Sequence, residues 1–117
     1  MPLAKISTNA ELSTELKDAL HENAANALAD CLKKPIEVCM VLLEDGCSMS
    51  FGGDGSVCGL IEVSGIDLTG SGASIEQLAK RLGGDLASFL GTVPERVFVK
   101  ITDVPRGMWG NGKMIFY

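Results

Sequence analysis

Two segments with helical periodicity, each flanked by short apolar stretches, constrain the fold of this chain more than any other feature. Apolar side chains recur at helical spacing across residues 13–32 and again across residues 74–90. Ser13 and Ser74 precede these segments as N-cap candidates. Ser74 and Gln77 also have the spacing of a capping box. The sequence therefore predicts two amphipathic helices in well-separated parts of the chain.

The stretches around these helices have the composition of strands. Strands are expected at residues 2–8, 36–44 and 56–66, and after a turn within residues 92–104. Pro35 ends the first helix, because a proline disfavours helical geometry in the residue before it. The glycine-rich residues 45–55 are expected to form a connection with room for one short strand. The predicted element order is β-α-β followed by β-α-β.

The two halves also show a weak internal repeat. Val38 corresponds to Val97 and Glu44 to Asp103, both at an offset of 59 residues (97 − 38 and 103 − 44). The repeat predicts two similar β-α-β units, each with parallel strands joined by a right-handed helical crossover. The expected fold is an α/β protein of the α+β type, with a four-stranded mixed sheet and both helices on one face. At 117 residues, a single domain over residues 1–117 is expected.

The other face of the sheet needs a cover. We expect a set of apolar strand residues to point away from the helices: Leu3, Val38, Met40, Leu60, Val97 and Val99. Such a face is too apolar for open water, so a partner subunit is the simplest cover.

Composition excludes several classes of function. The net charge is −5 and the isoelectric point is about 4.7, which argues against nucleic acid or an anionic membrane as the main partner. The longest apolar runs, such as "VCMVLL", are too short to cross a bilayer, and no classical signal peptide is recognisable. With four cysteines, no C-x-x-C and one histidine, free thiols are expected and a metal site is not. The expected compartment is the cytoplasm.

The "MP" at the start of the chain has two interpretations. A small second residue allows the initiator methionine to be removed, which would leave the secondary amine of Pro2 as the first group. In an apolar pocket beside a cation, the pKa of such an amine falls and it can act as a base at neutral pH. If Met1 is retained, the nitrogen of Pro2 is an amide and the proline is only the stiff start of a strand.

Several short motifs in order resemble one known family. The motifs "MP", "KP", "MSFGG", "PERVFV" and "DVPRGMWG" resemble the macrophage migration inhibitory factor family of the tautomerase superfamily, which includes D-dopachrome tautomerase. The resemblance covers nearly the whole chain. It implies two β-α-β units per subunit and a homotrimer in which the sheets face inward and the active sites lie between subunits.

The resemblance also implies roles for individual residues. Pro2 corresponds to the family's catalytic base, and Lys34, in "KP", to the lysine that binds the substrate carboxylate. Ile66 corresponds to an isoleucine whose backbone contacts the substrate near the base. Phe98 corresponds to a pocket aromatic contributed by the neighbouring subunit, and Trp109 lies in the tail motif that lines the pocket.

The chain departs from the family pattern at four places. Gly65-Ile66-Asp67 replaces the usual S-I-G, and Lys100 replaces an asparagine, so that it supplies a second cation or closes the pocket. Phe98 lacks the hydroxyl of the more usual tyrosine. The tail after Trp109 lacks the usual second aromatic of the motif.

The resemblance implies an isomerase: a keto–enol tautomerase of the phenylpyruvate or dopachrome type that requires neither a cofactor nor a metal. Its substrate would be a small keto acid or a dopachrome-like compound. The alternative is a cytokine-like protein that binds a receptor, is secreted without a signal peptide, and retains only vestigial tautomerase activity. A third interpretation keeps Pro2 but assigns another reaction, such as decarboxylation or hydration.

Overall fold

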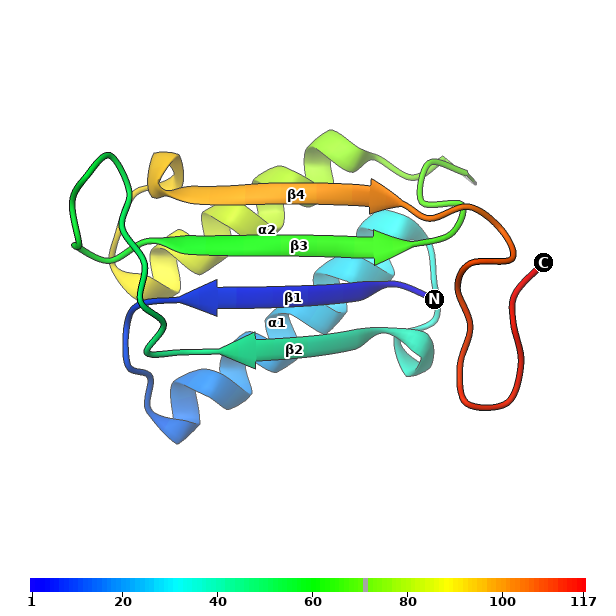
Figure 1. Ribbon diagram of the computed structural model, residues 1–117, viewed down its shortest axis with the longest axis horizontal. Coiled ribbons are helices and arrows are strands. Elements are labelled where there is room, and N and C mark those ends of the chain that lie inside the picture. Colours follow the sequence, from blue (N-terminus) through cyan, green and yellow to red (C-terminus); the bar gives the residue numbers. More distant parts are fainter. Residues whose placement is uncertain (71) are drawn as a thin grey trace.

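The computed structural model describes residues 1–70 and 72–117. Two β-α-β units follow one another along the chain, as predicted (Figure 1). The elements are β1 (Leu3–Thr8), α1 (Thr14–Leu32), η1 (Ile36–Val38), β2 (Met40–Glu44), β3 (Gly59–Gly65), α2 (Ile75–Leu90), η2 (Pro94–Arg96) and β4 (Val97–Asp103).

The four strands form one mixed sheet in the order β2-β1-β3-β4. Strand β1 is parallel to β2, and β3 is parallel to β4. The central strands β1 and β3 are antiparallel and join the two units. Helices α1 and α2 lie behind the same face of the sheet in Figure 1, which confirms the predicted layers.

Both helices begin at the predicted serines. The hydroxyl of Ser13 accepts a hydrogen bond from the Leu16 amide, and that of Ser74 accepts one from the Gln77 amide, each at 3.2 Å. These contacts satisfy amide groups that have no partner within the helix. Helix α1 ends at Leu32, and the next residue, Lys33, caps it in left-handed geometry with φ 57°.

The strand predicted over residues 36–44 is shorter than expected. After Pro35 the chain makes a 3₁₀ turn, closed by bonds from the Val38 amide to the Pro35 carbonyl and from the Cys39 amide to the Ile36 carbonyl. Pro35 is itself extended and only caps this turn, whose helical residues are Ile36–Val38. Strand β2 therefore begins at Met40.

The core lies between the sheet and the two helices. The core residues share near-complete burial: Ala4, Ile6, Leu20, Ala24, Ala27, Leu28, Leu32, Ile61, Val63, Leu68, Leu78, Leu82, Leu86, Ala87 and Val97. Gly83 lets α2 approach β4 closely, since a Cβ there would lie 3.2 Å from Val99 Cγ2.

The prediction that Val97 and Val99 face away from the helices is wrong. Val97 is buried in the core and Val99 packs against it. Successive strand residues point to opposite faces, so an error of one residue in phase exchanges the two faces. Phe98 points to the open face instead and is 62% exposed.

The open face of the sheet is more polar than the sequence suggested. Met40 and Leu42 are exposed there on β2, with exposures of 65% and 42%. On the three other strands, however, Lys5 of β1 pairs in register with Glu62 of β3, and Glu62 pairs with Lys100 of β4. A charged row thus crosses a face that also carries apolar side chains, including Leu3 and Leu60 on the central strands. In the part of the chain that the structure describes, no helix is long and apolar enough to span a membrane.

Candidate active site

Pro2 directly precedes β1, one of the two central strands of the sheet. Its side chain is almost fully buried, and its carbonyl accepts a hydrogen bond of 3.0 Å from the Met40 amide. On the other side, a Cβ on Gly65 would lie 3.3 Å from Pro2 Cα. The glycine therefore allows the end of β3 to pass directly beside the proline.

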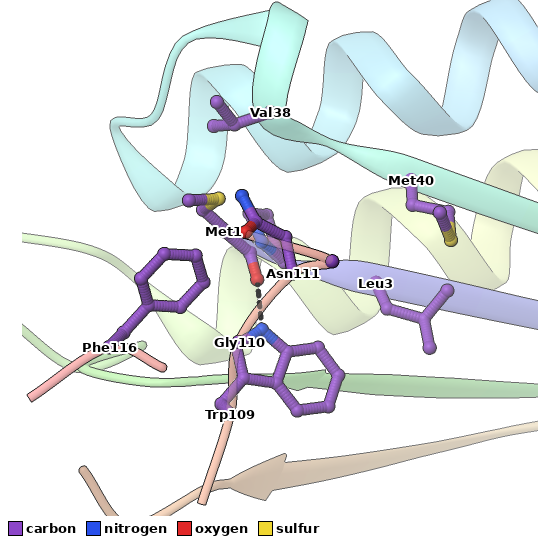
Figure 2. Close-up of a pocket in the computed structure, with 10 residues that line it drawn as sticks. Met1, Leu3, Val38, Met40, Trp109, Gly110, Asn111 and Phe116 are labelled. Carbon is purple, nitrogen blue, oxygen red and sulfur yellow. Dashed lines mark hydrogen bonds between the residues drawn. The ribbon is translucent and has the colours of Figure 1, made fainter. Parts of the chain in front are cut away.

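A cavity of about 380 Å³ opens at this end of the sheet. Its lining comes from the start of β1, the segment entering β2 and the C-terminal tail (Figure 2). The lining residues are Met1, Pro2, Leu3, Val38, Met40, Trp109, Gly110, Asn111, Gly112 and Phe116. This lining is mostly apolar, as small-molecule sites usually are.

The C-terminal tail folds back on itself beside the N-terminus (Figure 1). The Phe116 amide donates to the Trp109 carbonyl at 2.9 Å, and the Asn111 amide donates to the Met114 carbonyl at 3.0 Å. The Asn111 side-chain oxygen closes the turn by accepting from the amide of Met114 at 3.1 Å. Two aromatic side chains of the tail, Trp109 and Phe116, thereby reach the cavity (Figure 2).

Trp109 makes a direct polar contact with the N-terminal residue. Its indole Nε1 donates a hydrogen bond of 2.8 Å to the carbonyl oxygen of Met1, the dashed line in Figure 2. Both groups are partly buried. The indole N–H is therefore directed at an oxygen two covalent bonds from the nitrogen of Pro2.

The N-terminal amine lies in an environment that disfavours its charged form. Burial lowers the pKa of the Met1 amino group below its ordinary value, and the nearby ammonium of Lys34 lowers that pKa further. Cys39 acts in the opposite direction. Burial raises the pKa of the Cys39 thiol, which favours its neutral form. Lys34 is thus close enough to the amine to influence it.

Ile66 and Asp67 directly follow the glycine that contacts Pro2. Asp67 adopts left-handed geometry with φ 51°, where a glycine stands in the family pattern. Its carboxylate forms an ion pair with Arg106, which also donates a hydrogen bond of 2.6 Å to the Tyr117 carbonyl. Arg106 therefore offsets the negative charge that Asp67 carries and that a glycine at this position would not.

Phe98 and Lys100 lie away from this cavity. Leu3 pairs with Ser64 and Ser64 with Thr102, so the start of β1 is level with Thr102 on β4. Phe98 precedes Thr102 by four residues, which corresponds to about 13 Å along a strand. It instead meets Phe51 edge-to-face, with ring centroids 5.1 Å apart. Of the expected site residues, Pro2 and Trp109 line this cavity, whereas Lys34, Ile66, Phe98 and Lys100 do not. Lys34 acts on the N-terminal amine through its charge, and Ile66 follows the glycine beside Pro2.

Sequence reasoning missed part of the cavity wall. The tail motif after Trp109 lacks the second aromatic of the family pattern, but Phe116, seven residues after Trp109, supplies an aromatic side chain to the cavity. The apolar ending "MIFY" was the available signal. Val38 and Met40 were both expected on the open sheet face. Val38 lies instead in η1, Met40 lies on that face at the start of β2, and both line the cavity. Among residues 1–70 and 72–117, no group of three or more acidic, histidine or cysteine side chains is placed to hold a metal ion.

One family model matches nearly the whole chain. The family model described as macrophage migration inhibitory factor matches residues 1–115. A homologue of that factor from Prochlorococcus marinus has a TM-score of 0.88 and 24% identity, covering 98% of this chain and 99% of that one. The corresponding factor from Toxoplasma gondii has a TM-score of 0.85 and 26% identity, covering 97% and 99%.

A further solved structure, of Pt0534 inactivated by 2-oxo-3-pentynoate, has a TM-score of 0.82 and 24% identity. It covers 97% of this chain and 95% of that chain. No curated protein matches the sequence. The fold around the cavity is thus that of a broad set of solved structures.

Proposed function

Because the chain belongs to the macrophage migration inhibitory factor family, we propose that it is a cofactor-free keto–enol tautomerase whose base is the amine of Pro2 after removal of Met1. One observation carries this proposal. Pro2 lines an apolar cavity at whose edge burial and Lys34 lower the pKa of the Met1 amino group, and the amine of Pro2 would lie one residue further into the same surroundings. An amine with a lowered pKa is neutral, and hence basic, over more of the physiological pH range.

The proposed reaction balances with Pro2 as the one proton carrier. The neutral amine removes a proton from the carbon next to the carbonyl of a 2-oxo acid, and the electron pair moves to the carbonyl oxygen as an enolate. The proton then returns from the ammonium to that oxygen, which gives the enol and restores the amine. Lys34 and the backbone amide near Ile66 would hold the carboxylate and oppose the growing negative charge.

We further propose a homotrimer with sites between subunits. Phe98 and Lys100 lie on the open sheet face and are separated from the cavity of their own chain. They can contribute to a Pro2 site only if that site belongs to another copy. The exposed Met40 and Leu42 would be covered by the same contact. Light scattering coupled to size exclusion tests the assembly: a mass of one subunit would contradict it.

The compound 2-oxo-3-pentynoate, which inactivates Pt0534, provides a chemical probe of the proposed base. It is a 2-oxo acid with a triple bond conjugated to its carbonyl, and neutral amines add to such bonds. We expect one equivalent to attach at Pro2 in the protein that lacks Met1. Peptide mass mapping locates the adduct, and labelling of lysines alone would contradict the proposal.

The activity test compares two forms that differ only at the N-terminus. The protein lacking Met1, verified by intact mass, should convert phenylpyruvate between its keto and enol forms. The form that retains Met1 should be slower by about 10²–10⁴-fold, the usual contribution of a positioned base, because an amide nitrogen has no basic lone pair. Pro2→Gly should also lose activity. Equal rates in the two forms would exclude Pro2 as the base.

The receptor-binding alternative stays a prediction, and the same two forms separate it from catalysis. Receptor binding that depends on the fold alone should survive both Pro2→Gly and retention of Met1. Decarboxylation or hydration with the same base would appear in a screen of 2-oxo and unsaturated acids as turnover that the Met1-retaining form lacks.

A further inference from the structure

The hydrogen bond from Trp109 to Met1 marks a position immediately beside the proposed base. The acceptor is the carbonyl oxygen of Met1, 2.8 Å from Nε1 of the indole. Two covalent bonds, of about 1.2 and 1.3 Å, separate that oxygen from the nitrogen of Pro2. The indole N–H is therefore aimed at the place where an oxygen of a substrate in contact with Pro2 would lie.

The tail holds the indole in this place firmly. The Trp109 carbonyl accepts from the Phe116 amide at 2.9 Å, and Gly110 pairs with Ile115 across the turn. A Cβ on Gly110 would lie only 2.9 Å from Ile115 Cα, so the two arms of the turn are in close contact. The backbone from which the indole projects is thus held by contacts within the tail.

Removal of Met1 takes away the only acceptor that the described residues offer to this N–H. A partly buried donor without a partner is unfavourable, so the site favours a ligand that brings its own oxygen to the same point. Lys34 is the group suited to a carboxylate, because it carries a full charge. The neutral indole is suited to the second oxygen of a 2-oxo acid.

We propose that the Trp109 Nε1–H binds the 2-oxo oxygen of the substrate and donates to it as it becomes the enolate oxygen. The proposal rests on the proposed function and assigns a binding group to the oxygen that this reaction requires, on the carbon next to the one that loses the proton. An acid without that oxygen leaves the indole N–H unpaired. In the form that retains Met1, the carbonyl of Met1 occupies the same position and blocks it.

One spectroscopic experiment tests the contact without measuring turnover. The chain has a single tryptophan, so a ¹⁵N–¹H spectrum contains one indole resonance. In the protein lacking Met1, phenylpyruvate should move this resonance downfield, and 3-phenylpropionate, which lacks the 2-oxo oxygen, should not. In the form retaining Met1, the resonance should already be downfield and unresponsive. Saturation with phenylpyruvate without a downfield shift would overturn the proposal.

A kinetic experiment tests the catalytic consequence. Trp109→Phe keeps an aromatic ring and removes the donor, and replacement of the single tryptophan by 3-benzothienylalanine keeps the bicyclic shape as well. Both should lower kcat by about 10- to 100-fold with a much smaller change in KM, because the charge on the oxygen develops only during reaction. A benzothienylalanine protein with wild-type kcat would overturn the proposal.

The two experiments distinguish failure of this inference from failure of the proposed function. If the protein lacking Met1 turns over no 2-oxo acid, the proposed tautomerase activity fails, and the indole resonance still decides whether Trp109 binds the 2-oxo oxygen. If turnover is normal and the resonance does not move, only the role of Trp109 fails.

Discussion

Replacing Gly65 by alanine is the most local way to disturb Pro2 without changing it. A Cβ at Gly65 would lie 3.3 Å from Pro2 Cα and 2.9 Å from Leu68 Cδ2. The Leu68 side chain can rotate, whereas the backbone of Pro2 has to move by a few tenths of an ångström. Overpacking of this kind costs about 1–3 kcal/mol of unfolding free energy. Since a displacement of about 1 Å can cost 100-fold in rate, a loss of about 3- to 10-fold in kcat/KM is expected.

Gly84→Ala is the matched control for this substitution. Gly84 lies within α2, and a Cβ there would meet nothing within 4 Å. Alanine should stabilise the helix by about 0.5–1 kcal/mol and leave kcat/KM unchanged. Urea denaturation at one fixed protein concentration and phenylpyruvate kinetics give both quantities. The account of the site is wrong if Gly65→Ala matches the Gly84→Ala protein in stability and rate.

Two further predictions concern charged side chains. Arg96 donates to the carbonyls of Val57 and Ser56, both at 3.0 Å, so Arg96→Ala should lower the free energy of unfolding by about 2–3 kcal/mol. Arg81→Ala breaks one exposed ion pair with Asp30 and should cost less than about 1 kcal/mol, and equal losses in urea denaturation would count against this distinction. The charge of Lys34 lowers the pKa of the Met1 amino group. Lys34→Ala should therefore raise the pKa of the Pro2 amine that replaces it once Met1 is removed. The amine is a base only when unprotonated, so the acid limb of kcat/KM against pH should move to higher pH, while the exposed Lys80→Ala leaves it in place.

The helices could be predicted closely because their signals are local. Ser13 and Ser74 mark the starts of α1 and α2, and the structure shows the expected side-chain caps. The bounds and faces of the strands could not be predicted as closely, because a short run of apolar residues does not show which of them point to which face of the sheet. Residues 36–44 contain a 3₁₀ turn before β2, and Val97 points into the core although it was expected on the open face.

Some residues of the candidate site could be predicted from the sequence and others could not. The family resemblance assigned Pro2 and Trp109 to the site, and both line the cavity, whereas Lys34 and Ile66 lie outside its lining. Phe116 reaches the cavity only because the tail folds back on itself, which depends on backbone hydrogen bonds that no sequence motif announced. For Phe98, a role in the site depends on a second copy of the chain and cannot be read from one subunit.

The pKa of the Pro2 amine is the quantity on which the account depends most directly. It can be measured by ¹⁵N NMR titration of proline-labelled protein from which Met1 has been removed. We expect the amine to titrate below the ordinary range of N-terminal amines, about 7.7–8.0, and to match the acid limb of kcat/KM. An amine that titrates within or above that range, or a profile that does not follow it, would contradict the assignment of Pro2 as the base.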